Sequence, residues 1–399
     1  MRSLLSGVLL GVCAVGVLAA DLEPLEWPSL RGPDGVTGVA PKAAWLTTLD
    51  TATKLWEANV GQGYSSVVVA DGKALTMGNA GKQTTVLCVE AGTGKEVWRH
   101  AFPSGKTSGA GSSSTPTVEK DKAYVLGSGG TLLCLDLAKG GVVWQRNLAG
   151  DHQLQPPQWA FAGSPTVFNS LLIVNVGGRG LAVDKASGKT VWSTGASGAG
   201  YATVIPYTVG NVTKVLVFTA KELVAVNPVN GQRVWGIPWK TGYDVNASAP
   251  IPIGQAIFVA SGYGTGSALV IDQGATAAVS WRSKVQTQLS GGVHINGYVY
   301  AVSASKGTPG ELHCVDLKTG KSAWSRPGFG QGSLIGAGDK LLVLSDKGML
   351  CLVQADPSAY KELSRKKLLD GQCWTPPTIA AGRIYARNSA GLVVCYGVK

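Results

Sequence analysis

The 399-residue chain lacks several features that define other classes of protein. After the first twenty residues no stretch is apolar enough to span a bilayer, so no transmembrane span is expected. The 55 glycines show no Gly-x-y period, and charged residues make up only 15% of a chain that is 45% hydrophobic. This composition allows a sizeable core and disfavours wholesale disorder. Many glycines together with 19 prolines predict many short strands joined by tight turns.

Signatures of common catalytic sites are also missing. The Gly-Lys-Ser/Thr triplets at 105–107, 188–190 and 320–322 lack the earlier glycine of a phosphate-binding loop, and Gly195–Ala199 lacks the last glycine of a nucleophile elbow. The histidines show no zinc-site spacing. They are His100, His152, His294 and His313.

The first twenty residues resemble a secretory leader. Arg2 is followed by an apolar run from Leu4 to Leu18 and by Ala19 and Ala20. This order predicts a cleavable signal peptide over residues 1–20 and an exported, periplasmic or secreted protein. A buried first helix is the alternative, and Cys13 leaves lipidation open.

The net charge of +11 favours acidic partners in principle. Acidic polymers, anionic lipid or an acidic protein would fit it. The basic residues are scattered at turns, which indicates a solvated surface, and the leader argues against nucleic acid.

A tryptophan recurs along most of the chain at intervals of 42 to 48 residues. A polar residue stands eight or nine positions before six of these seven tryptophans, as in Asp184-Lys-Ala-Ser-Gly-Lys-Thr-Val-Trp192. An aspartate that bonds turn amides, followed by a glycine in a tight turn, is typical of a β-hairpin. The series is Trp56, Trp98, Trp144, Trp192, Trp235, Trp281 and Trp324.

Each hairpin is preceded by two further strands, as in Ser113-Ser-Thr-Pro-Thr-Val118 and Ala123-Tyr-Val-Leu126. Four strands per unit match a propeller blade. The last unit stops after Leu392-Val-Val-Cys-Tyr396, whereas Leu55–Val60 is a tryptophan strand with no blade before it. We therefore predict an all-β, eight-bladed β-propeller of four-stranded antiparallel blades, in which Leu55–Val60 completes the last blade and removes two sheet edges.

The tryptophans are interpreted as structural residues that cover the hairpins between adjacent blades. Blade seven has none, because Cys351-Leu-Val-Gln-Ala-Asp-Pro leads to Lys361-Glu-Leu363. A looser seam is expected there.

The repeated Asp-x-x-x-Gly-Lys-x-x-Trp pattern resembles the pyrroloquinoline-quinone (PQQ)-like propeller repeat over about residues 54–399. Quinoprotein alcohol dehydrogenases and the outer-membrane assembly factor BamB share that repeat. Trp27-Pro-Ser-Leu-Arg-Gly-Pro33 is similar to the opening of exported quinoprotein-like propellers of planctomycete-type bacteria. The domain plan is thus a signal peptide at 1–20, an N-terminal extension at 21–53 and the propeller at 54–399.

The quinoprotein enzymes of this family use an adjacent Cys-Cys disulfide, a calcium held by carboxylate and amide, and an aspartate base. This chain has no Cys-Cys pair, and its residues do not match the calcium ligands or the base. Five cysteines occupy a tight position near the hairpin and are expected to be buried free thiols, with metal binding or disulfides as alternatives. They are Cys88, Cys134, Cys314, Cys351 and Cys395, and Cys373 stands outside the pattern.

The loops that lead into the first strand of each blade are expected to gather around the channel on one face. They carry the candidate binding residues Trp159, Tyr201, Tyr243, Asp244 and Trp374. Ordinary packing is the alternative for each. No catalytic, cofactor or metal ligand is assigned.

The leading hypothesis is an exported, non-catalytic scaffold that binds a protein or polymer partner through one propeller face. A BamB-like role in envelope assembly is one version of it. The alternative is a PQQ-dependent quinoprotein oxidoreductase with calcium. The oligomeric state is left open.

Overall fold

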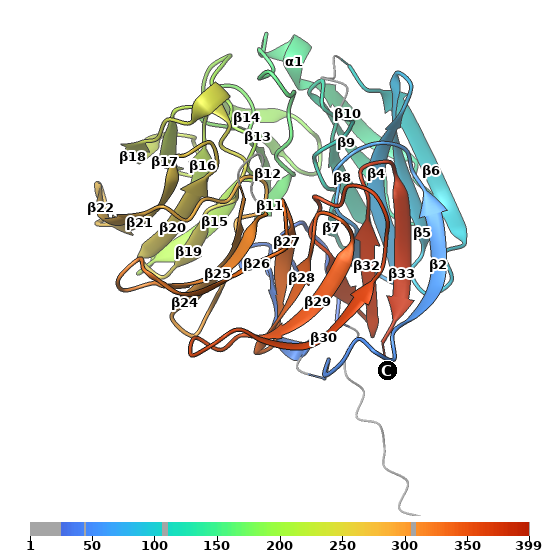
Figure 1. Cartoon of the computed structure of the whole chain (residues 1–399). Helices are drawn as coiled ribbons and strands as arrows, with labels where there is room; N and C mark the ends of the chain where they lie inside the picture. Colours follow the sequence, from blue (N-terminus) through green and yellow to red (C-terminus); the bar gives the residue numbers. More distant parts are fainter. Residues whose placement is uncertain (1–24, 44, 106–110, 305–308, 399) are drawn as a thin grey trace, which may run out of the picture.

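The computed structural model describes residues 25–43, 45–105, 111–304 and 309–398. The predicted signal peptide and Cys13 lie outside these ranges. Within them, 32 strands form eight antiparallel sheets of four strands, and one further two-residue strand joins the seventh sheet. The sheets follow one another around a ring, with the first strand of each sheet innermost (Figure 1). The predicted eight-bladed propeller is confirmed.

The first four blades follow the chain in order. Blade 1 contains β3 (Val68–Ala70), β4 (Lys73–Ala80), β5 (Gln83–Glu90) and β6 (Glu96–Pro103). Blade 2 contains β7 (Thr117–Glu119), β8 (Lys122–Leu126), β9 (Thr131–Asp136) and β10 (Val142–Asn147). Blade 3 contains β11 (Thr166–Phe168), β12 (Leu171–Val174), β13 (Leu181–Asp184) and β14 (Thr190–Ser193). Blade 4 contains β15 (Ile205–Val209), β16 (Val212–Phe218), β17 (Glu222–Val226) and β18 (Arg233–Pro238).

The other four blades complete the ring. Blade 5 contains β19 (Ile251–Ile253), β20 (Ala256–Ser261), β21 (Gly266–Asp272) and β22 (Ala277–Ser283). Blade 6 contains β23 (Val293–Ile295), β24 (Tyr298–Ser303), β25 (Glu311–Asp316) and β26 (Ser322–Pro327). Blade 7 contains β27 (Ser333–Ala337), β28 (Lys340–Leu344), β29 (Met349–Gln354) and β30 (Lys361–Lys367). Blade 8 contains β31 (Thr378–Ala380), β32 (Arg383–Arg387), β33 (Leu392–Gly397) and β2 (Thr53–Asn59).

The helical segments are short. They are η1 (Pro41–Ala43), α1 (Leu148–Asp151) and η2 (Gly242–Asp244). In the described part of the chain, no helix reaches the length and apolar character that crossing a membrane requires.

Ring closure is made by the N-terminal strand. β2 pairs antiparallel with β33, and Trp56 lies opposite Cys395. The blue strand beside the red C-terminal strands in Figure 1 shows this pairing. The predicted completion of the last blade is therefore confirmed. It joins chain segments more than 330 residues apart and leaves no unpaired gap in the ring.

The hairpin turns explain the repeated motif. In blade 2, Oδ1 of Asp136 accepts hydrogen bonds from the backbone amides of Ala138 and Lys139, at 3.1 and 2.9 Å. Gly140 then adopts φ +70°, a left-handed conformation that favours glycine. A Cβ at Gly140 would also lie only 2.5 Å from Cδ2 of Trp98 in the preceding blade. Both the turn and the neighbouring tryptophan thus require glycine.

The tryptophans connect neighbouring blades. Trp98 on β6 donates its indole N–H to the carbonyl of Leu137 in blade 2 at 2.9 Å. Five others of the series make the same bond to the turn of the next blade, at 2.8 to 3.0 Å. These five are Trp56, Trp144, Trp192, Trp281 and Trp324.

The seam after Trp235 is built differently. A buried ion pair lies there, in which Nζ of Lys214 is 2.8 Å from each carboxylate oxygen of Asp272. Tyr207 donates to the same carboxylate at 2.5 Å. Blades 4 and 5 are therefore joined by charge-assisted hydrogen bonds.

Hydroxyl groups link the inner strands. The backbone amide of Ser66 donates to Oγ1 of Thr115 at 2.8 Å, and the amide of Thr115 donates to Oγ of Ser164 at 3.0 Å. The amide of Ser164 continues to Oγ1 of Thr203 at 3.0 Å. The recurring Ser and Thr residues before each inner strand therefore fasten blades 1 to 4 around the channel.

The N-terminal extension crosses the end of the channel. Trp27 forms a two-bond bridge with Val69 in blade 1, and the carbonyl of Pro28 accepts from Val118 in blade 2. Only three residues later, Arg31 donates to the carbonyl of Gly292, which leads into blade 6. Blades 2 and 6 are opposite one another in a ring of eight. The segment then pairs in parallel with blade 7 through β1 (Val39–Ala40).

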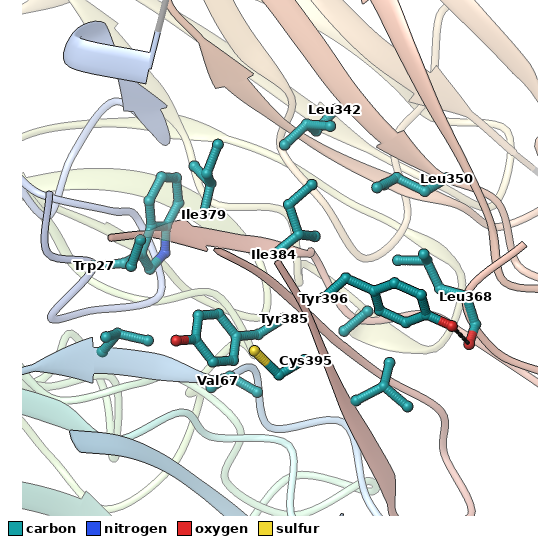
Figure 2. Close-up of a cluster of buried hydrophobic side chains, with 14 of the residues drawn as sticks. Trp27, Val67, Leu342, Leu350, Leu368, Ile379, Ile384, Tyr385, Cys395 and Tyr396 are labelled. Carbon is teal, nitrogen blue, oxygen red and sulfur yellow. Dashed lines mark hydrogen bonds between the residues drawn. The ribbon is translucent and has the colours of Figure 1, made fainter. Parts of the chain in front are cut away.

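The seam between blades 7 and 8 is packed by this extension. Ser364 on β30 occupies the position of the missing tryptophan, opposite Leu352, and its Oγ accepts a hydrogen bond from the amide of Leu49. Leu46 and Leu49 are fully buried in the core of this region. Figure 2 shows Trp27 in the same cluster as Ile379 and Tyr385. The expectation of a looser seam is therefore wrong, because a distant segment fills the space.

Candidate functional site

A cavity of about 640 Å³ occupies the channel. Leu30, Arg31 and Gly38 of the N-terminal extension line one end of it. At the other end the lining comes from the loops that lead into the inner strands, including Trp159 and Trp374. In Figure 1 helix α1 marks the loop side at the top, and the blue extension lies at the bottom. The extension therefore forms a floor, and the mouth lies among the loops.

Four aromatic rings from separate loops lie in contact at this mouth. The ring of Trp159 is 6.0 Å from that of Tyr201 and 6.2 Å from that of Tyr243, both edge to face. Tyr243 is in turn 5.6 Å from Tyr263. We call these four residues the mouth cluster. Edge-to-face geometry suits the quadrupoles of aromatic rings.

A second aromatic pair comes from the other side of the ring closure. Tyr64, before blade 1, stacks on Trp374, before blade 8, with ring centroids 5.6 Å apart and an interplanar angle of 17°. Both residues line the cavity. Burial raises the pKa of Tyr64 and of Tyr201, so both phenols stay neutral at pH 7.

The structure thus places the five residues predicted for a binding face as follows. Trp159, Tyr201 and Trp374 line the cavity, whereas Tyr243 and Asp244 lie exposed in η2 at the rim. Trp159, Tyr201 and Tyr243 come together in the mouth cluster, and Trp374 belongs to the separate stacked pair. Whether these residues bind a partner remains a prediction.

The rim carries backbone strain. Tyr243 and Asp244 are adjacent and have φ values of +61° and +56°, and Tyr263 has +56°. A bulky side chain at positive φ is an outlier, and such strain tends to collect at functional sites. The side chains of Tyr243 and Tyr263 at these strained positions are exposed.

Amides form the polar part of the wall. Nε2 of Gln331 donates to Oε1 of Gln288 at 3.2 Å, and Nε2 of Gln288 donates to the hydroxyl of Tyr263 at 3.3 Å. Oε1 of Gln331 is buried and accepts no hydrogen bond from the described residues. One acceptor of the lining is therefore free.

Sequence reasoning missed Tyr64, Tyr263, Gln288, Gln331 and Arg31. Tyr263 lies in Ser261-Gly-Tyr-Gly-Thr-Gly266, a further segment that resembles exported quinoprotein-like propellers, and this resemblance was the available signal for it. Arg31 likewise stands within the family-like Trp27–Pro33 segment. Nothing in the sequence alone places these segments at the channel.

Arg31 is the charged residue of the described lining. Its side chain is almost fully buried, at 6% exposure. Nε donates to the carbonyl of Val36, and the two terminal nitrogens donate to the carbonyls of Gly292 and Thr37. Burial lowers the pKa of Arg31 to about 10, against the opposite effect of Asp34. The residue therefore remains a cation at pH 7.

The cysteines lie in the core, away from this lining. All six described cysteines are free and buried. Cys88, Cys134, Cys314 and Cys395 lie opposite a tryptophan on the neighbouring strand. Cys351 is one residue out of this register and lies opposite Arg365. Its assignment to the common position is therefore wrong. Burial raises the pKa of Cys88 to about 12, which makes that thiol unreactive.

Comparison with known proteins identifies the family. A family model described as outer membrane protein assembly factor BamB matches residues 42–158 and 82–326, which together span more than half of the chain. The chain belongs to the BamB family. The resemblance to PQQ-like repeat propellers is thereby confirmed.

Individual relatives of this BamB-family chain are distant. The outer membrane protein assembly factor BamB of Moranella endobia (strain PCIT) is 24% identical over 250 residues, which are 58% of this chain and 62% of that protein. The alignment thus spans less than two thirds of the relative.

Two solved structures show the shared fold. BamB from Moraxella catarrhalis has a TM-score of 0.63 at 16% identity, covering 88% of this chain and 98% of its own. A quinohemoprotein alcohol dehydrogenase from Pseudomonas putida HK5 has a TM-score of 0.69 at 14% identity, covering 94% and 80%. At these identities the likeness concerns architecture alone.

The lining of this BamB-family propeller does not fit the calcium site of the quinoprotein enzymes. That site requires a carboxylate beside an amide, and the described cavity lining holds amides but no aspartate or glutamate. The described residues also contain no group of three or more histidine, cysteine or acidic side chains arranged to hold a metal. We derive no reaction step through PQQ or calcium.

Proposed function

We propose that this chain is an exported, non-catalytic BamB-like scaffold that binds a protein partner through the mouth of its propeller. Family membership supports a protein partner and a role in envelope assembly, because its relatives are outer membrane protein assembly factors. The leader predicted at residues 1–20 supports export.

The mouth cluster is the observation that carries this proposal. Tyr243 is 71% exposed and Tyr263 40% exposed, and Leu289, which lines the same cavity as Tyr263, is 38% exposed. Large apolar side chains gathered on one face mark interaction sites on soluble proteins. Aromatic residues are also the common anchors of protein interfaces.

The surrounding fold supports the same conclusion. The rings stand on loops that are held by a rigid eight-bladed frame, an arrangement that positions binding residues well. Ring contacts with Trp159 and Tyr263 hold Tyr243 in place at the rim although its φ is positive. A preorganised face loses less conformational entropy on binding.

Site-specific photo-crosslinking in the producing cells tests the proposal. A photoreactive amino acid replaces Tyr243 at the mouth, and in a matched variant it replaces Val97 on outer strand β6, which is 38% exposed. We expect one reproducible protein adduct, identified by mass spectrometry as an envelope protein, from position 243 only. Equal adducts at both positions, or none at 243, would contradict the proposal.

The quinoprotein alternative has its own test. PQQ and calcium are added to the purified protein, and cofactor binding and dye-linked alcohol oxidation are measured. Stoichiometric binding with turnover would overturn the non-catalytic part of the proposal, whereas the absence of both would support it.

A further inference from the structure

The floor of the cavity holds a buried cation, Arg31, that is not directly ion-paired within the described residues. Arg31 makes three hydrogen bonds, all to backbone carbonyls, and forms no ion pair with the described residues. Asp34 is the acidic residue that acts on it, but the Asp34 carboxylate is engaged by the amides of Val36 and Thr37 and by the Thr37 hydroxyl. A buried charge without a counterion is costly.

Arg387 shows what a purely structural buried arginine looks like in this chain. It is 1% exposed, and its guanidinium donates to four backbone carbonyls and to the hydroxyl of Thr76. Arg387 joins blade 8 to blade 1 and is not part of the cavity lining. Arg31 has fewer acceptors and does line the cavity.

Two N–H groups of Arg31 have no acceptor among the described residues. A guanidinium has five N–H donors, and the three bonds use Nε and one hydrogen on each terminal nitrogen. One hydrogen on each terminal nitrogen is left, and each can donate to a carboxylate oxygen. One isolated cation suits a monoanion better than a phosphate dianion.

Apart from Arg31, most of the described lining of the cavity is apolar. Leu30, Val245, Leu289, Leu334 and Ile335 contribute to it, and no acidic side chain does so in the described lining. The orphan Oε1 of Gln331 also lies in this wall and needs an N–H donor. A ligand that satisfies all three features carries a carboxylate, an apolar body and an amide N–H.

We propose that the cavity receives the free C-terminal end of a polypeptide with an apolar last residue, whose carboxylate binds Arg31. A peptide amide near that end donates to Gln331, and the last side chain contacts the apolar wall. This inference rests on the proposed function, since it specifies which part of a protein partner enters the mouth.

Calorimetric titration with synthetic peptides tests the inference on the unmodified protein. The probe is an N-acetylated hexapeptide of glycine and serine that ends in two phenylalanines, prepared as the free acid and as the C-terminal amide. We expect the amide to bind at least about tenfold more weakly, because it lacks the charge that pairs with Arg31. Equal affinity of the two forms would overturn the inference while leaving partner binding at the mouth intact.

Substitutions in the cavity test whether the C-terminal carboxylate of the peptide binds at Arg31. Arg31→Met should remove the difference between acid and amide, and Gln331→Leu should weaken both forms by a similar factor. Arg99→Met on outer strand β6, where Arg99 is paired with Glu96 at the surface, is the control and should change nothing. If Arg31→Met fails to fold, the acid-to-amide comparison on the natural chain still decides the question.

Two further outcomes separate this inference from the proposed function. If neither peptide binds but crosslinking at position 243 still captures a protein, the C-terminal site is wrong and the scaffold role stands. If N-acetyl-phenylalanine binds as tightly as the hexapeptide, the site takes a small carboxylic acid, and the polypeptide proposal is overturned.

Discussion

The backbone amide of Leu49 donates a 2.8 Å hydrogen bond to Oγ of Ser364, at the strand position where the other seven blades carry tryptophan. Leu49 comes from the N-terminal extension and Ser364 from β30, 315 residues later. The extension thus takes over the seam that the repeat leaves without its tryptophan, and at the same time it closes the channel.

Leu49→Ala tests whether the extension stabilises the seam at which blade 7 lacks a tryptophan. Leu49 is 0% exposed, so we expect the free energy of unfolding to fall by about 2–5 kcal/mol through lost burial and a residual cavity. The measurement is urea unfolding followed by tryptophan fluorescence. Leu55→Ala on β2, where the side chain is 47% exposed, is the control and should stay within about 0.5 kcal/mol. Similar losses in the two variants would contradict a packed seam.

Trp98→Phe probes the blade-to-blade hydrogen bond. The substitution keeps an aromatic ring but leaves the buried carbonyl of Leu137 without its indole donor, which should cost about 1–3 kcal/mol. Trp98→Ala should cost about 3–5 kcal/mol. Thermal and urea unfolding measure both. A loss for Trp98→Phe no larger than that for the neighbouring exposed Val97→Ala would show that the bond does not stabilise the ring.

Asp272→Asn removes the charge partner of buried Lys214. Both side chains are buried, at 0% and 5% exposure, so an uncompensated ammonium remains and we expect a loss of about 3–5 kcal/mol. Asp121→Asn removes a comparable partner of Lys122 at the surface, where the aspartate is 75% exposed, and should leave the free energy of unfolding almost unchanged. Equal effects in urea unfolding would indicate that water reaches the Lys214 pair.

Lowering the pH should reduce the stability that the Lys214–Asp272 pair gives to the seam between blades 4 and 5. Burial acts to raise the pKa of Asp272, but hydrogen bonds from Lys214, Tyr207 and the amide of Gly274 outweigh it, and the folded pKa lies below 3.8. A lowered folded pKa gives stability that is fully present above the unfolded value and is lost as the pH falls through the folded value. The difference in stability between the natural chain and Asp272→Asn should therefore shrink below about pH 4. A difference that is constant from pH 7 to pH 3 would contradict this.

Tyr243→Gly separates binding from stability at the mouth. Relief of the positive φ is worth about 1–3 kcal/mol, and it offsets the two ring contacts, each worth about 0.5–1.5 kcal/mol. We expect the free energy of unfolding to change by less than about 1 kcal/mol, whereas partner binding is lost. The contrast is Trp98→Ala, a buried aromatic whose removal should destabilise the protein strongly. A large loss of stability in Tyr243→Gly would mean that the ring is structural.

The repeat made the propeller blades predictable because residues close together in the sequence determine each hairpin. Asp136, Gly140 and the tryptophan that follows lie within nine residues of one another, so turn chemistry is visible in the sequence. The error at Cys351 has a related cause. Blade 7 lacks the tryptophan that sets the alignment, and the true register, Leu352 opposite Ser364, is displaced by one residue.

The site was harder to predict because its parts are far apart in the chain. Trp159, Tyr201 and Tyr243 could be chosen from their loops, since the inner loops of a propeller converge. Tyr64 and Trp374 come together only through closure of the ring, and Tyr263 comes from a loop within blade 5. Arg31 enters the cavity because the extension crosses the channel, and this path has no counterpart in the repeat.

The sequence by itself determined the blades, their number and the strand that closes them, because short-range turn chemistry and a regular tryptophan interval repeat along the whole chain. Only the tertiary structure decided the course of the N-terminal extension, the packing of Leu49 on Ser364 and the position of Arg31 in the floor. These features depend on long-range contacts that occur once, and a contact without repetition leaves no period in the sequence.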